Sequence, residues 1–86
     1  MKHFATSSFW THYNRLPEHI RELADKNFAL LKDDSQHQSL HFKKIGRLWS
    51  VHVGLQYRAL GLDKGGAIVW FWIGSHSDYE SILKRE

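Results

Sequence analysis

The chain has no cysteine, a single proline and no apolar run long enough to cross a membrane. Without cysteine there is neither a disulfide framework nor a thiolate metal site. The longest apolar run, Ala67–Ile73, falls far short of the roughly 20 residues that span a bilayer. No signal-like apolar stretch follows the first residues. We therefore expect a cytoplasmic protein that has no membrane partner.

The seven histidines are the remaining candidates for holding a metal, but no cysteine accompanies them. Structural zinc sites are typically built from histidine together with cysteine pairs at fixed spacings. We therefore expect neither a metal nor another cofactor. The imidazoles titrate near neutral pH and add to the positive charge of the chain below it.

Length and composition predict a single folded domain over residues 1–86. A chain of 86 residues corresponds to one domain. Its 42% hydrophobic and 14% aromatic content supports a packed core and argues against disorder. The net charge of +3, with histidine neutral, is mildly basic. Such a charge permits a nucleic-acid partner without requiring one.

The first third of the chain has the pattern of a helical hairpin. Ser7 or Ser8 can cap a helix over Phe9–Leu16. Pro17 suits the first turn of a second helix, which should end near Lys32. Apolar residues at helical spacing should face the core; they are Phe9, Tyr13 and Leu16 in the first helix and Ile20, Leu23, Ala24, Phe28 and Leu31 in the second.

Alternating or continuous apolar stretches predict a set of strands. They are Lys2–Thr6, Leu40–Ile45, Trp49–Val53, Tyr57–Leu60 and Ala67–Ile73. Glycine-containing turns at 46–47, 54–56 and 61–66 join the last four. We expect Trp70 and Trp72 to share one face of the last strand, as core residues.

A short helix over Asp78–Lys84 should follow the last strand. Ser77 would be its N-cap, and Glu80 three residues later would complete a capping box. Two helices followed by a strand meander predict an α+β domain. Its N-terminal helical hairpin would pack on a mostly antiparallel sheet of four to five strands. All helices would lie on one face of that sheet.

Three polar residues lie at or near the ends of different predicted strands, where side chains can converge on one site: His52, Arg58 and His76. His52 alternates with Val51 and Val53 and is equally suited to face solvent. Arg58 can instead pair with an acidic helix residue, a common surface role. A cation at His76 would oppose the dipole of the following helix, which favours a functional role there.

Three local patterns follow one another along the chain. They are Leu16-Pro17 between the helices, VHVGLQYRAL at residues 51–60 and IGSHSDY at residues 73–79. Together they resemble the RelE/ParE-type toxins of bacterial type II toxin–antitoxin systems. The second is similar to the family's V-R-V-G-x-x-Y-R hairpin and the third to the terminal I-G-x-H-x-x-Y of RelE-like members, with a Gly-Ser-His-Ser like that of YafQ-type toxins. The resemblance covers essentially the whole chain.

The resemblance implies a toxin that is neutralised by a cognate antitoxin encoded nearby. The active members of the family are endoribonucleases that cut messenger RNA, usually on a translating ribosome, without a metal. ParE-like relatives share the fold but poison DNA gyrase, so fold alone does not decide the function. A gyrase-binding toxin and a degenerate, inactive relative are therefore the alternatives.

The resemblance also assigns roles to individual residues. Arg58 matches the arginine that holds the scissile phosphate in RelE-like nucleases. His76 stands where these enzymes place an arginine or a histidine near the leaving group. Tyr79 resembles the terminal tyrosine that stacks on the RNA, although it suits the core equally well. RelE carries two lysines on the strand that here has Ser50 and His52.

Cleavage of RNA by its own 2′-OH needs a base, an acid and positive charge on the phosphoryl oxygens. We expect His52 to be the general base, Arg58 the phosphate clamp and His76 the general acid, or the two histidines in exchanged roles. Tyr79 would stack on a base or orient the nucleotide.

A small basic cluster precedes these residues on a predicted hairpin: Lys43, Lys44 and Arg47. Its side chains can bind the phosphates of messenger or ribosomal RNA. A solvated hairpin tip is the alternative interpretation. The expected partners are thus an antitoxin, messenger RNA and the ribosome.

Overall fold

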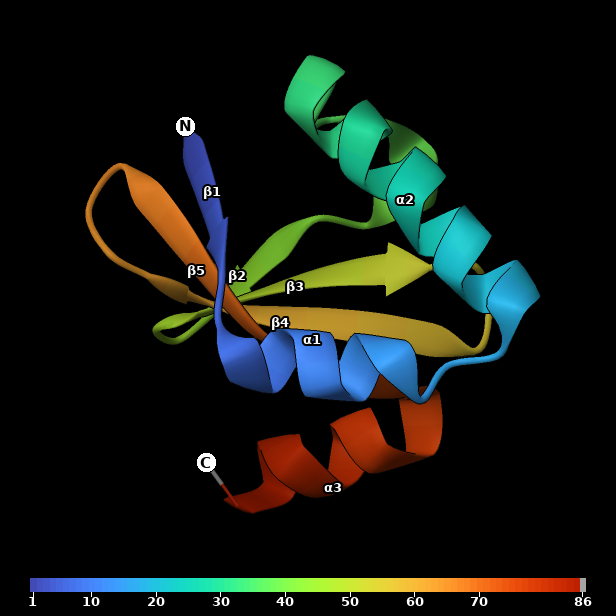
Figure 1. Ribbon diagram of the computed structural model, residues 1–86. Coiled ribbons are helices and arrows are strands. Elements are labelled where there is room, and N and C mark those ends of the chain that lie inside the picture. The colour runs from blue at the N-terminus through green and yellow to red at the C-terminus, as the bar shows by residue number, and fades with distance from the viewer. Residues whose placement is uncertain (86) are drawn as a thin grey trace.

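The computed structural model describes residues 1–85, which form a five-stranded sheet with helices on both faces (Figure 1). The strands are β1 (Lys2–Ala5), β2 (Lys43–Ile45), β3 (Leu48–Val53), β4 (Tyr57–Asp63) and β5 (Ala67–Ser75). Their order in the sheet is β1-β5-β4-β3-β2, and only the β1–β5 pair is parallel. The predicted α+β fold with a mostly antiparallel sheet is confirmed.

The predicted helical hairpin is present as α1 (Ser7–Asn14) and α2 (Glu18–Asp33). The cap of α1 is Thr6 and not Ser7 or Ser8, because the Thr6 hydroxyl accepts a hydrogen bond from the amide of Phe9 at 3.0 Å. Pro17 is the N-cap residue of α2, just before its first turn. The hydroxyl of Tyr13 donates to Asp25 at 2.8 Å and ties the two helices together.

The hairpin covers one face of the sheet, where it forms the larger core. The buried members of this core are Leu16, Ile20, Leu31, Leu40, Val51, Val53, Ala59, Ile68, Trp70 and Ile73. Phe28 was expected in this core, but 41% of it is exposed. It borders a cavity of about 260 Å³ between α1, α2 and the sheet.

The remaining helix, α3 (His76–Arg85), corrects two predictions. It packs on the opposite face of the sheet, where Leu60, Trp72 and Tyr79 form a second buried cluster. The expectation that all helices share one face is therefore wrong. The helix also begins earlier than expected, because the hydroxyl of Ser75, and not that of Ser77, accepts from the amide of Asp78 at 3.2 Å.

A β-bulge separates the two tryptophans that were expected on one strand face. Leu60 pairs with Trp72 and its neighbour Gly61 pairs with Trp70, so Phe71 is the extra residue on β5. Because adjacent residues of β4 point to opposite faces, the two indoles enter opposite cores. The prediction of a shared face is wrong, whereas the prediction that both are core residues is confirmed.

Two strand boundaries also differ from the prediction. The stretch Leu40–Ile45 splits into a 3₁₀ helix, η1 (Gln38–Leu40), and the short strand β2, because His41 has a left-handed backbone with φ of 44°. Strand β4 continues through Gly61 to Asp63, where a turn had been expected. Gly61 lies within this strand, and the side chains of Ile68 and Trp70 on β5 approach it so closely that they leave no room for a Cβ.

Replacing Gly61 with alanine should destabilise the protein by about 1–3 kcal/mol, the usual cost of overpacking a core. The added Cβ would collide with Ile68 Cγ2 and lie 2.9 Å from Trp70 Cε3. Urea unfolding of the two proteins measures the difference. The control is Gly46→Asn at a left-handed turn with open space around it, which should change little. Equal stability of Gly61→Ala and the wild type would contradict the bulge geometry.

Candidate active site

The register of β3 and β4 places His52 directly opposite Arg58. On the same face, one pair further along, Ser50 lies opposite the buried Leu60. This is the face that α3 covers, since Leu60 belongs to the cluster of α3. Two of the predicted site residues are thus brought together by strand pairing alone.

Arg58 is nearly buried, with 7% of its surface exposed. Its Nη1 donates to two carbonyl oxygens, that of Leu55 in the β3–β4 turn at 3.1 Å and that of Tyr57 at the start of β4 at 2.8 Å. Among residues 1–85 the guanidinium makes no ion pair with a carboxylate. A buried cation that no anion neutralises costs free energy, which an anionic ligand would recover.

The imidazole of His52 is held in its neutral form. Burial lowers its pKa from 6.5 to about 4, and the positive charges of Arg58, His41, Lys43 and His76 act in the same direction. Each of these groups disfavours a further cation at this point. His52 is therefore unprotonated at neutral pH, as a general base must be.

His41 is part of this site, although its sequence context predicts a strand there. Its ring stacks on that of His52, with centroids 4.2 Å apart and the planes at 25°. The left-handed backbone of His41 has no signal in the sequence, because it depends on the turn after η1. From the other face of the sheet, Asn27 Nδ2 of α2 donates to the carbonyl of His52 at 3.2 Å.

His76 is the first residue of α3 and lies next to the β3–β4 turn, because its amide donates to the carbonyl of Gln56 at 2.7 Å. Its Nε2 pairs with Glu80 Oε1 at 2.8 Å, one helical turn later. The capping box predicted for Glu80 is therefore absent, and Glu80 orients a histidine instead. The buried Nδ1 of His76 has no hydrogen-bond partner among residues 1–85.

Tyr79 is a core residue in this structure, with 7% of its surface exposed. Its hydroxyl accepts a hydrogen bond from Ser50 Oγ at 3.0 Å, and its ring lies 6.0 Å from that of His76. A ring buried in this way leaves little surface on which a base can stack. The geometry suits support of His76 better than the expected contact with RNA.

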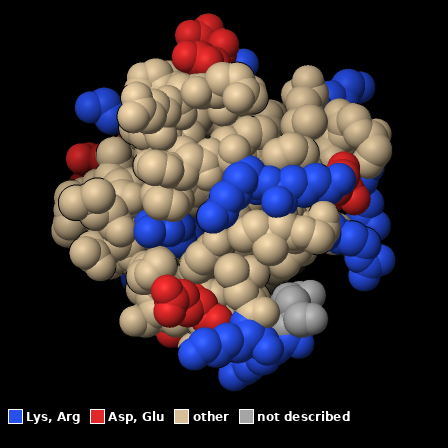
Figure 2. Space-filling view, turned by 180° about the vertical axis from the view of Figure 1, so that it is seen from behind, with Lys and Arg blue, Asp and Glu red and all other residues tan. Residues whose placement is uncertain are grey.

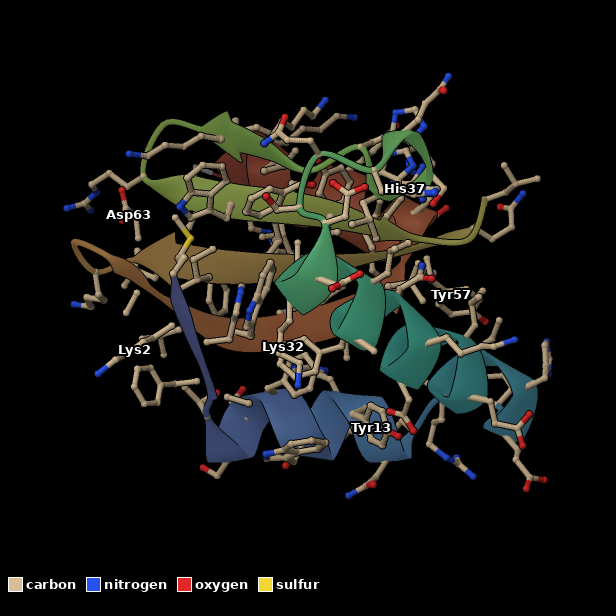
Figure 3. The ribbon with its side chains drawn as sticks, turned by 90° about the horizontal axis from the view of Figure 1, so that it is seen from above. Lys2, Tyr13, Lys32, His37, Tyr57 and Asp63 are labelled. Carbon is tan, nitrogen blue, oxygen red and sulfur yellow. The ribbon has the colours of Figure 1, made fainter. Side chains whose placement is uncertain are left out.

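The basic hairpin divides between the two faces of the sheet. Lys43 pairs with Ser50 and so faces the side of His52, whereas Lys44 pairs with Trp49 and points the other way. Lys44 forms an ion pair with Asp63 at 2.5 Å. Asp63 lies at one end of the sheet, and Tyr57 and the loop of His37 lie toward the other end (Figure 3). Arg47 is exposed in the turn. Lys43 is thus the member that reaches the site.

Lysine and arginine side chains also gather on the rear face of the molecule. Figure 2, which views the protein from behind, shows Lys and Arg side chains running across the middle of this face. Acidic side chains lie toward its margins. Such a field attracts a polyanion.

Within residues 1–85 no three His, Cys, Asp or Glu side chains gather as a metal site would require. His37 and His41 stand four residues apart, but η1 separates them. His37 Nδ1 lies 2.9 Å from the hydroxyl of Ser39, and His41 stacks on His52. Nor does any helix in this part of the chain have the length and apolar character needed to cross a membrane.

Comparison with known proteins identifies the family. A family model described as the ParE-like toxin domain matches residues 18–81. No curated protein sequence gives a significant match. Among solved structures, the chain is similar to one from the RelB–RelE antitoxin–toxin complex of Methanococcus jannaschii, with a TM-score of 0.72, 17% identity and coverage of 92% of this chain and 96% of that one.

Two further structures share the fold. The YoeB/ParE toxin of Agrobacterium tumefaciens has a TM-score of 0.66 and 16% identity, with 88% and 99% of the two chains covered. The isolated RelE toxin of E. coli has a TM-score of 0.62 and 12% identity, with 98% and 96% covered. The RelE/ParE fold predicted from the sequence is confirmed. The match over residues 18–81 shows that this chain belongs to the ParE-like toxin family.

Proposed function

We propose that this toxin cuts messenger RNA, at the ribosome, by directing a 2′-OH of the RNA against the adjacent phosphate. The observation that supports this proposal is the nearly buried Arg58, which has no carboxylate partner among residues 1–85. His52, Lys43 and His76 add positive charge around it. A phosphodiester supplies the negative charge that this site lacks, and a guanidinium binds it with two parallel hydrogen bonds.

The reaction follows from the positions of three side chains. Neutral His52 accepts the 2′-OH proton while the 2′-oxygen attacks phosphorus. Arg58, with Lys43 on the same face, stabilises the charge on the phosphoryl oxygens. His76, oriented by Glu80, releases its Nε2 proton from that carboxylate to the 5′-oxygen as the bond of this oxygen to phosphorus breaks. The products are a 2′,3′-cyclic phosphate and a free 5′-OH.

The low pKa of His52 in the free protein is compatible with this role. A base that titrates at about 4 is always in the correct form at neutral pH, but it attracts a proton weakly. A bound phosphate places negative charge beside the same cations and raises the pKa of His52. Substrate binding would therefore strengthen the base where it is needed.

Poisoning of DNA gyrase is the second candidate, because the matching family model is that of ParE-like toxins. That activity would need a binding surface but no proton transfer. The convergence of His52, Arg58 and His76 is the observation that favours RNA cleavage over it.

Arg58→Ala should relieve the growth arrest that the induced toxin causes. Removal of one group that stabilises the transition state costs on the order of a hundredfold in rate. Northern blots and primer extension should show fragmented messages for the wild type and for the control Arg15→Ala, which changes an exposed residue outside the site. Circular dichroism would confirm that Arg58→Ala folds. Intact messages together with broken chromosomal DNA would support the gyrase alternative instead.

The pH dependence of cleavage should report two different pKa values for His52, one in the free enzyme and one in the RNA complex. The acid limb of kcat/KM reports free His52 and should lie near the pKa of about 4, and activity is lost below it because His52 gains a proton. The acid limb of kcat should lie at higher pH, because bound phosphate raises that pKa. The measurement is a cleavage-rate profile on ribosome-bound message, with and without a chelator.

Two variants identify the residue that causes each limb of this pH–rate profile. His52→Gln should abolish the acid limb, and His76→Gln should abolish the alkaline limb and slow cleavage by roughly a hundredfold. A His76→Gln profile that matches the wild type would remove His76 from the mechanism. Loss of cleavage on adding the chelator would contradict the metal-free reaction.

We further infer that an antitoxin encoded nearby neutralises the protein, because the similar RelE chain of Methanococcus jannaschii is found in a complex with the antitoxin RelB. The α1–α2 face offers a place for an apolar segment of that partner. The cavity there is lined by Phe4, Trp10 and Phe28, of which 56%, 49% and 41% are exposed. Side chains of this size are rarely left together in water on a protein without a partner.

Trp10→Ser should weaken binding of the antitoxin by about tenfold or more while leaving RNA cleavage unchanged, because exposed tryptophans at an interface contribute strongly to affinity. Co-purification with the adjacent gene product, followed by calorimetry, measures the effect. His19→Ala, on the exposed side of α2 and outside the cavity, is the control. Equal affinities for both variants would place the partner elsewhere on the surface.

A further inference from the structure

His41 and His52 form a stacked pair at the edge of the site. Their ring centroids are 4.2 Å apart, which is van der Waals contact over much of one ring face. His52 is partly buried, whereas His41 is exposed. His41, which has no role in the proposed mechanism so far, therefore covers one face of the His52 ring.

The chain holds His41 in this position by its neighbours on both sides. Leu40 is fully buried in the larger core, and the ring of Phe42 stacks on Trp49 with centroids 4.5 Å apart. His41 between them has a left-handed backbone, which a residue with a side chain adopts only at a cost in free energy. The two anchors fix this conformation and direct the imidazole to His52.

We propose that His41 is a positioning residue for the cleavage reaction, and that its ring packs on His52 to hold that imidazole beside Arg58. The proposal rests on the proposed function, since it assigns His41 a role in aligning the base. A base displaced by about 1 Å can lose up to a hundredfold in rate. The backbone of His52 is already fixed by Asn27, so the stack would restrain the remaining freedom of its side chain.

The same contact also affects the charge of His52. The groups that face it are Arg58 on β4, Lys43 on β2, His76 on α3 and His41 after η1, all of them cationic or able to become so. The ring of His41 adds to the burial that disfavours a proton on His52. Removal of that ring exposes His52 to water, whereas a phenyl ring in its place keeps it covered.

Two variants separate a stacking role from a merely structural one. His41→Asn removes the ring but keeps a residue that tolerates the left-handed backbone, and His41→Phe keeps an aromatic ring that cannot titrate. His19→Ala is the control for loss of an exposed histidine. For each protein, NMR of the His52 ring without RNA gives its titration midpoint, and single-turnover cleavage on ribosome-bound message gives kcat and KM.

In His41→Asn the His52 midpoint should rise by about one pH unit. In the same variant kcat should fall by roughly tenfold with KM unchanged. In His41→Phe kcat should stay close to that of the wild type, and the His52 midpoint should rise less than in His41→Asn, because the ring is kept and only its charge is lost. A midpoint in His41→Asn equal to that in His19→Ala would overturn the proposal. If the wild type cuts no RNA, the proposed function fails, and the midpoints alone still decide whether His41 positions His52.

Discussion

The antiparallel pairing of β3 with β4 is the constraint on which the site depends. It sets His52 opposite Arg58, and the guanidinium donates to the carbonyls of Leu55 in the turn that closes the pair and of Tyr57 at the start of β4. The same turn receives the amide of His76, so α3 begins at the site. A register shift of one residue would move His52 into the core of the helical hairpin and disperse all three groups.

This arrangement concentrates positive charge where folding alone would not. Arg58 is nearly buried without a carboxylate partner among residues 1–85, and His52 has its pKa lowered to about 4 beside it. Both features oppose stability, because a desolvated cation and a titratable group with a shifted pKa each favour the unfolded chain under some condition. A small domain has little stability in reserve. Such a cost is typical of groups arranged for a ligand.

Local pattern was enough to predict the elements but not their relations in space. The apolar spacing of α2 predicted the helix and, apart from Phe28, its buried face, and the alternation of β3 predicted that strand. The bulge at Leu60/Gly61 depends on close approach of β5 to a glycine, and this is invisible along the chain. The position of His41 could not be foreseen for the same reason, since Leu40 and Phe42 anchor it through contacts with distant residues.

One face of the sheet borders the apolar cavity and the other bears the candidate site, and the side chain of Asn27 contacts the structure of both. Asn27 lines the apolar cavity between α1 and α2, and its amide also holds the carbonyl of His52, whose side chain points to the opposite face. Alternation along β3 therefore puts the cavity and the proposed general base within one residue of each other. A ligand that moved Asn27 would act on the backbone of His52 without touching Arg58. A single hydrogen bond of 3.2 Å thus connects a residue that lines the cavity to the backbone of the proposed general base.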